Sequence, residues 1–157
     1  NTTDDTIDVT PGDGFAQDAS GNTSLRAAIM EANVLAGTDT IVLAADPYVL
    51  SLGELTISSV VNLDGADAGS TLIDGGGSSR IFDIDGAGNL GASELTVQGG
   101  NGAGALFTGD GGGIYVASGG TLALDRFIVT GNSAPGKGGG IYNSGSATLT
   151  EGTISGN

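Results

Sequence analysis

Two stretches of the chain repeat one another: GGGIYVASGGTLALDRFIVTGN at residues 111–132 and GGGIYNSGSATLTEGTISGN at residues 138–157. Both begin with GGGIY, contain a central TL and end with GN. Ile114 and Ile141 are 27 positions apart, and Asn132 and Asn157 are 25 positions apart. A repeat of roughly 20–30 residues is typical of solenoids, in which each repeat forms one structural unit and stacks on the next.

Each repeat contains short runs in which apolar and polar residues alternate, such as TLAL and ATLT, separated by Gly, Asn and Ser. Alternation with a period of two indicates strands, and the separating residues are those that favour turns. The sequence therefore predicts an all-β fold, a right-handed parallel β-helix in which each repeat forms one coil. Thr and Tyr side chains would face outward, and five aliphatic side chains would face the core: Ile114, Leu122, Leu124, Ile141 and Leu149.

The middle of the chain contains three corners in which a Leu or Ile precedes Asp-Gly, at Asp64, Asp74 and Asp85. If one coil takes about 21 residues, Asp64 and Asp85 occupy the same corner of successive coils, and Asp74 occupies another. We expect residues 1–157 to form a single domain, with about five coils in residues 41–157.

The N-terminal part differs from the rest of the chain. Residues 23–37, TSLRAAIMEANVLAG, place Leu25, Ala28, Ile29 and Ala32 on one helical face, with Thr23 or Ser24 as N-cap and Gly37 as the end. Solenoid ends expose apolar interior and unpaired strand edges, so they need caps. We therefore expect residues 1–40 to supply a strand (TIDV, residues 6–9), a loop and a capping helix.

Composition excludes several classes of function. The chain has 18 acidic and 4 basic residues, for a net charge of −14, so nucleic acid and anionic membrane surfaces are poor partners. No apolar run approaches the about 20 residues of a membrane helix, so we expect no membrane insertion. The chain has no Cys and no His, which excludes disulfides, thiolate metal sites and histidine bases.

Several motifs together resemble a family of bacterial secreted and cell-surface proteins. PGDGFAQDASGNTSLRAAIMEAN, TDTIVL and LDGADAGSTLIDGGGSSRIFDI are similar to the CSLREA-type N-terminal domain and the parallel β-helix that follows it, and the GGGIY…SGN units resemble the repeats of polymorphic outer-membrane proteins. The resemblance implies an extracellular or surface location and an adhesive role, with no catalytic residues. Family members usually carry a Cys pair where this chain has Ala16 and Thr23, so other contacts must hold the loop before the helix.

These observations predict a structural function, and we expect no catalytic residues. The protein would be a rigid extracellular solenoid for surface display, adhesion or self-assembly into fibres through its C-terminal coil. Ile141, Leu149 and Ile154 would be the buried anchors of that edge, which a second copy or a continuation of the chain would cover, with TIDV as one candidate partner strand.

Two alternative functions remain open at this stage. A polysaccharide lyase or hydrolase would use acids such as Asp64 and Asp85, and a carbohydrate-binding module would use a Tyr115–Tyr142 ladder as its sugar platform. No cofactor is expected apart from calcium, for which Asp64, Asp83 and Asp85 are the candidate ligands. The competing structural interpretation is that the Asp-Gly pairs form tight turns and the tyrosines stabilise a sheet.

Overall fold

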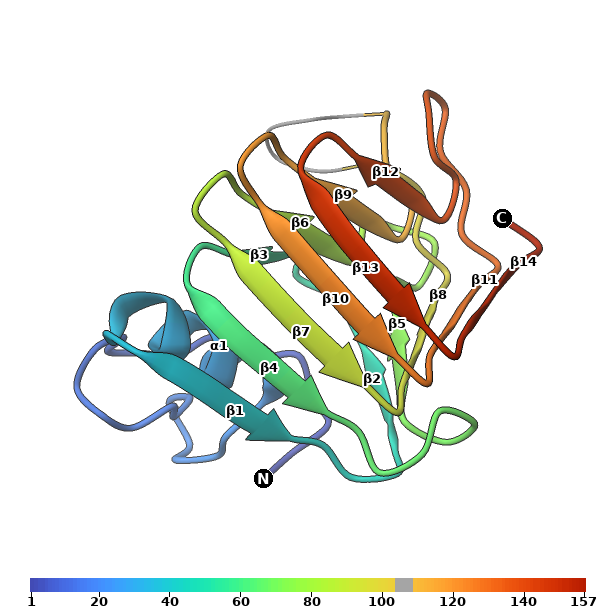
Figure 1. The fold of residues 1–157 in the computed structure, drawn as a ribbon. Coiled ribbons are helices and arrows are strands. Elements are labelled where there is room, and N and C mark those ends of the chain that lie inside the picture. The colour runs from blue at the N-terminus through green and yellow to red at the C-terminus, as the bar shows by residue number, and fades with distance from the viewer. Residues whose placement is uncertain (104–108) are drawn as a thin grey trace.

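The computed structural model describes residues 1–103 and 109–157, which form three parallel sheets and one helix (Figure 1). Sheet A holds the longest strands: β1 (Thr38–Val42), β4 (Val60–Asp64), β7 (Asn89–Ser93), β10 (Thr121–Asp125) and β13 (Ser146–Thr150). Sheet B consists of β2 (Pro47–Val49), β5 (Leu72–Asp74), β8 (Thr96–Gln98), β11 (Ile128–Thr130) and β14 (Thr153–Ser155). Sheet C consists of β3 (Leu55–Ile57), β6 (Phe82–Ile84), β9 (Ile114–Val116) and β12 (Ile141–Asn143).

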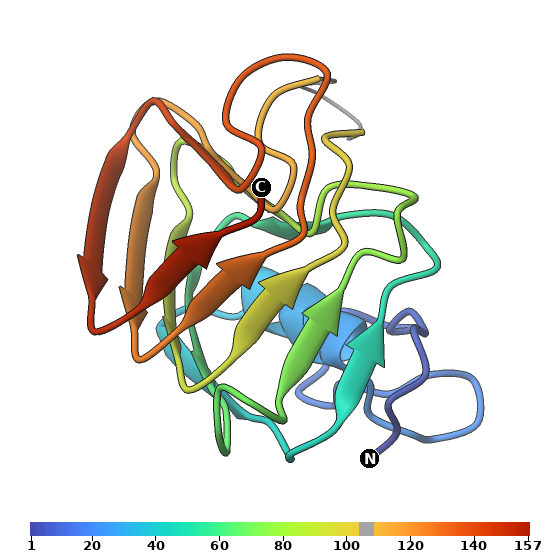
Figure 2. The same ribbon diagram turned by 90° about the vertical axis from the view of Figure 1, so that its right-hand side faces the viewer.

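The chain visits the three sheets in the order A, B, C and then returns to sheet A one strand further along. Every strand pairing is parallel, and the views in Figures 1 and 2 show the coils stacked side by side along one axis. The fold is therefore a parallel β-helix, as the repeat predicted. Ile114 and Ile141 lie opposite each other on adjacent strands, which confirms the stacking of the two GGGIY units.

The coils are longer than the Asp-Gly spacing suggested. Val60 pairs with Asn89, so one turn of the β-helix takes 29 residues there, and Asp64 lies beside Ser93. Asp64, Asp74 and Asp85 follow or end β4, β5 and β6, which belong to sheets A, B and C. The expectation that Asp64 and Asp85 share a corner of successive coils was wrong: the three Asp-Gly pairs are the three corners of a single coil.

The core is a set of aliphatic rows that run from coil to coil. In sheet A one inner row comprises Val61, Leu90 and Leu122, which pair in register and are fully buried. Ile114, Leu122 and Leu124 face inward as predicted, and each is at most 2 % exposed. Ile141 packs against this core and is only partly buried, whereas Leu149 is 44 % exposed because it belongs to the last coil.

Helix α1 (Leu25–Val34) closes the N-terminal end of the solenoid. Ser24 caps it by accepting a hydrogen bond from the Ala27 N–H at 3.0 Å, and Leu25, Ile29 and Ala32 are buried in the core. The helix packs against β1, β3 and β4 and lies behind the sheets in Figure 2. Residues 6–9, expected to form a strand, belong to none of the sheets.

Within the described residues, no helix has the length and apolar character that would let it cross a membrane.

Candidate functional site

The C-terminal coil, residues 138–157, contains β12, β13 and β14, which are the last strands of their sheets. We call it the terminal coil. Leu149 is 44 % exposed and Ile154 is 48 % exposed, although their strand partners Leu124 and Val129 in the preceding coil are 2 % and 0 % exposed. The difference arises because the terminal coil covers the preceding one and is itself uncovered. The three predicted edge residues, Ile141, Leu149 and Ile154, all belong to the terminal coil, and each lies in a different sheet.

An asparagine ladder holds the terminal coil to its neighbour. Asn157 Oδ1 accepts hydrogen bonds from the Asn132 N–H at 3.0 Å and from Asn132 Nδ2 at 2.9 Å. Asn157 Nδ2 donates to the Val129 and Ser155 carbonyls. These hydrogen bonds connect the Asn157 side chain to Asn132 and Val129 and so tie the terminal coil to the preceding coil.

The opposite end of the solenoid is sealed by side chains that bind the free backbone of the first coil. Arg26 donates to the carbonyls of Glu54 and Gly53, and Asn33 Nδ2 donates to the Thr56 carbonyl at 2.7 Å in β3. Asp5 accepts hydrogen bonds from the backbone N–H groups of residues 51 and 52, which follow β2, both at 2.7 Å. A further strand would need free backbone N–H and C=O groups in these segments. The groups named here are already hydrogen-bonded to the side chains of Asp5, Arg26 and Asn33.

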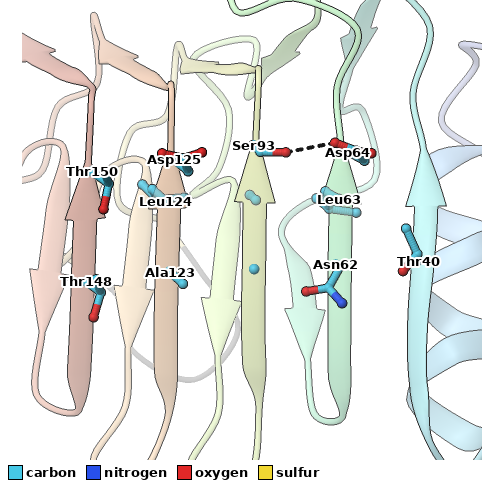
Figure 3. A pocket seen from close by; sticks show the side chains of 12 residues that line it. Thr40, Asn62, Leu63, Asp64, Ser93, Ala123, Leu124, Asp125, Thr148 and Thr150 are labelled. Atoms are coloured by element: carbon cyan, nitrogen blue, oxygen red, sulfur yellow. Dashed lines mark hydrogen bonds between the residues drawn. The ribbon is translucent and has the colours of Figure 1, made fainter.

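The outer face of sheet A carries a shallow groove of about 400 Å³ (Figure 3). Its floor is low because Gly91 and Ala123 lie side by side in the middle of the sheet. Beside them runs a polar row, one residue from each of β4, β7, β10 and β13, in the order Asp64, Ser93, Asp125, Thr150. Ser93 Oγ donates to Asp64 Oδ1 at 2.8 Å. The groove offers repeated hydrogen-bonding groups at the spacing of the strands.

A polar cluster lies buried against sheet C. The fully buried Arg80 pairs with Glu54 at 2.8 Å and donates to the carbonyls of Asp110 and Gly111. Its guanidinium carbon lies 4.9 Å from the centre of the Tyr115 ring, a cation–π geometry. Arg80 thus fastens residues 110 and 111 to the sheet.

Asp83 is the exceptional acid of this cluster. It is 1 % exposed, its nearest cation is Arg80 Nη1 at 3.9 Å, and neither carboxylate oxygen has a hydrogen-bond partner within the described residues. Burial, reinforced by the negative charges of Glu54 and Asp85 against the opposing charge of Arg80, raises the pKa of Asp83 to about 6. Because the side chain is enclosed, this acid is out of reach of a polymeric substrate.

The two tyrosines proposed as a sugar platform stack on one another. The Tyr115 and Tyr142 ring centres are 5.2 Å apart, with 15° between their planes. Tyr115 is only 8 % exposed because Arg80 lies over its other face. The stack therefore matches the structural interpretation, and it leaves little of the Tyr115 ring face for a sugar.

The three aspartates considered for calcium are not brought together. Asp64 lies on the outer face of sheet A, Asp83 is enclosed against sheet C, and Asp85 Oδ1 accepts from the N–H groups of Ala87 and Gly88. In the described ranges, no three acidic side chains come close enough to hold a metal ion. Asp85 thus behaves as a turn residue, as its Asp-Gly context allowed.

Sequence reasoning did not identify the Arg80 cluster, because its members come from separate coils and have no shared motif. The available signal was the position of Arg80 beside an apolar run, RIFDI, in a chain with only four basic residues. An isolated Arg next to a core strand indicates a buried ion pair, since an unpaired buried charge is costly.

The chain was compared with protein-family models, with curated proteins and with solved structures, and no match was found in any of the three.

Proposed function

We propose that this chain is a rigid structural solenoid that works outside the cell or at a bacterial cell surface, where it displays or extends an adhesive surface. The observation that carries the proposal is the continuous in-register stacking of the coils around a single aliphatic core. Each interior strand is hydrogen-bonded to a strand on both sides, so bending the rod would break hydrogen bonds in several strands at once.

The chemistry of the surface supports the same proposal. A net charge of −14 keeps a strand-rich surface soluble, and the absence of cysteine leaves the fold independent of redox conditions. The resemblance to secreted and surface β-helix proteins supports the location.

Hydrogen exchange tests the rigidity. We expect the amides of β4, β7 and β10 to exchange only through global unfolding, because they pair on both sides. Labelling of intact producing cells with an antibody tests the location. Independent opening of single coils, or recovery of the protein only from the cytosol, would contradict the proposal.

A second candidate function, passive glycan binding, is favoured by the groove on sheet A. Its polar row repeats at the strand spacing of about 4.8 Å, which suits a linear polymer of sugar units. Retention on neutral glycans that falls at least tenfold in Asn62→Ala/Asp64→Ala and stays unchanged in Asp46→Ala, an exposed acid outside the groove, would support binding.

The enzymatic alternative has less support. A general acid needs a raised pKa and access to the substrate, whereas Asp83, the acid with a raised pKa within the described residues, is enclosed. Incubation with a panel of neutral and acidic polysaccharides tests it: the appearance of cleavage products with the purified chain would replace the structural function by a catalytic one.

A further inference from the structure

The groove on the outer face of sheet A has an acidic edge. Among the described residues that line it, Asp64 and Asp125 are the charged ones, and both are acidic. Arg126 follows β10 directly, and it pairs with Glu94 as well as with Asp125. These four side chains comprise three carboxylates and one guanidinium, an excess of negative charge that attracts a cationic ligand to the groove.

Both groove aspartates keep an oxygen atom for a ligand. Asp64 is exposed, and it accepts the Ser93 hydroxyl at 2.8 Å through Oδ1. The Asp125 side chain is 38 % exposed and pairs with Arg126 through Oδ2. Each carboxylate can therefore accept a hydrogen bond from an ammonium group through its second oxygen, and such charge-assisted bonds are stronger than neutral ones.

The strand register fixes the distance between the two aspartates. Asp64 in β4 pairs with Ser93 in β7, and Ser93 pairs with Asp125 in β10. Each of these strands is hydrogen-bonded to a strand on both sides, so the row keeps the strand spacing of about 4.8 Å. Asp64 and Asp125 therefore lie about 10 Å apart, with one strand between them (Figure 3).

A linear β-1,4-linked glycan matches this spacing when it carries amino groups. One strand spacing is close to the length of one sugar unit, and successive units of such a chain turn to opposite sides. The same substituent thus returns to the same side at every second unit, which is the interval between Asp64 and Asp125. The Ser93 hydroxyl, between them, can bond to the intervening unit.

The floor of the groove provides room for the sugar rings. Gly91 and Ala123 keep the middle of the sheet low. A Cβ at Gly91 would overlap Asn62 Oδ1, so the Asn62 amide reaches over the glycine and lies at the floor. This amide can donate to and accept from the hydroxyl groups of a sugar.

On the basis of the glycan binding proposed above as the second function, we infer that this groove prefers linear glycans of unacetylated amino sugars. Asp64 and Asp125 bind the ammonium groups of alternate units, and Asn62 and Ser93 bind hydroxyl groups. An acetylated amine has no charge but leaves the chain geometry unchanged, so the acetylated polymer binds through the neutral contacts alone. Exposed ion pairs are individually weak, so we expect a preference of about fivefold to tenfold that decreases as salt is added.

Titration of the full chain, followed by NMR chemical shifts, tests the preference. The probes are hexamers of β-1,4-linked glucosamine and of N-acetylglucosamine, because a short ligand limits the general attraction between a polycation and a protein of charge −14. Asp64→Asn/Asp125→Asn should weaken binding of the glucosamine hexamer about fivefold to tenfold and change binding of the acetylated hexamer less than about twofold. Asp13→Asn/Asp46→Asn removes the same charge from exposed acids outside the groove, and it should bind both hexamers like the parent.

Gly91→Thr tests the floor of the groove. The Thr side chain occupies the space above the sheet without changing the charge, and Thr is a residue that suits strands. This variant should weaken binding of the two hexamers to the same extent, whereas an unchanged affinity for both would place the ligand elsewhere and overturn the inference.

The remaining outcomes separate the preference from glycan binding itself. Equal affinity of the parent for the two hexamers would overturn the preference and leave glycan binding standing, whereas no binding of either hexamer would reject both. An equal loss in Asp13→Asn/Asp46→Asn and in Asp64→Asn/Asp125→Asn would show attraction by net charge alone and overturn the inference. Tighter binding of a lysine hexapeptide that depends on Asp64 and Asp125 would assign the groove to a peptide and also overturn it.

Discussion

Asn157 lies directly above Asn132 in the next coil, with 2.9 Å between Asn132 Nδ2 and Asn157 Oδ1. Asn132 Oδ1 in turn accepts a hydrogen bond from the Gly100 N–H at 2.9 Å, one coil further back. At this corner the side-chain amide of Asn132 thus forms hydrogen bonds with backbone groups of two coils. Gly131 and Gly156, just before these residues, have φ values of 63° and 65°, which glycine adopts without strain.

The ladder predicts unequal effects for its two members. Asn132 is 2 % exposed and bonds to Gly100, Val97, Thr130 and Asn157. Asn132→Ala should lower the free energy of unfolding by about 2–3 kcal/mol, because it leaves buried backbone groups unpaired. Asn157→Ala, at the exposed end, should cost about 1 kcal/mol. Urea unfolding of both variants measures the difference, and equal losses would contradict the ladder.

Asp83 predicts a pH dependence with a defined sign. Its folded-state pKa of about 6 lies above the ordinary value of 3.8, so the unfolded chain loses this proton first as the pH rises. The stabilisation from the protonated form is complete below pH 3.8 and is lost as the pH rises through 6. Asp83→Asn should therefore be more stable than the parent at pH 8 by about 1–3 kcal/mol, and this advantage should shrink towards pH 4.

Thermal unfolding from pH 4 to pH 8 measures this effect as the difference between Asp83→Asn and the parent. Asp46→Asn, at an exposed acid, is the control and should follow the parent curve. A difference that is constant across this range would show that Asp83 does not titrate as described.

Gly152 makes room for the ring of Phe127. The two residues occupy the same corner of adjacent coils, and a Cβ at Gly152 would overlap the Phe127 ring. Gly152→Ala should destabilise the chain by about 1–3 kcal/mol through overpacking. The equivalent position one coil earlier is Leu95, so Phe127→Leu should relieve the clash. A double-mutant cycle should give a favourable coupling, and strictly additive losses would refute the contact.

Glu31 connects helix α1 to the loop that precedes it. This helical carboxylate is 5 % exposed and accepts hydrogen bonds from the N–H groups of Gly12 and Gly14. Glu31→Ala should raise hydrogen exchange at these two amides at least tenfold, because their acceptor is removed, and leave the coils protected. Glu151→Ala, at an exposed glutamate, should leave both amides unchanged.

The repeat predicted the stacking because strand periodicity and turn residues are local signals. Ile114, Leu122 and Leu124 were correctly placed in the core on alternation alone, and Ser24 was one of the two residues named as the helix cap. The sequence also predicted that the Asp-Gly pairs form turns, but the prediction that Asp64 and Asp85 occupy the same corner of successive coils was wrong. The spacing between Asp-Gly pairs does not distinguish a coil with three strands from a coil with two, because every corner of the coil has the same kind of turn sequence.

The sequence by itself determined the stacked strands of the repeats and the capping helix, because these follow from periodicity and turn chemistry. Only the tertiary structure decided which corners of successive coils lie next to each other. It also showed that Arg80 and Asp83 are both buried, and that Arg26 and Asn33 hydrogen-bond to the backbone of the first coil. These features depend on contacts between residues more than 20 positions apart, and such contacts depend on how many residues each coil takes.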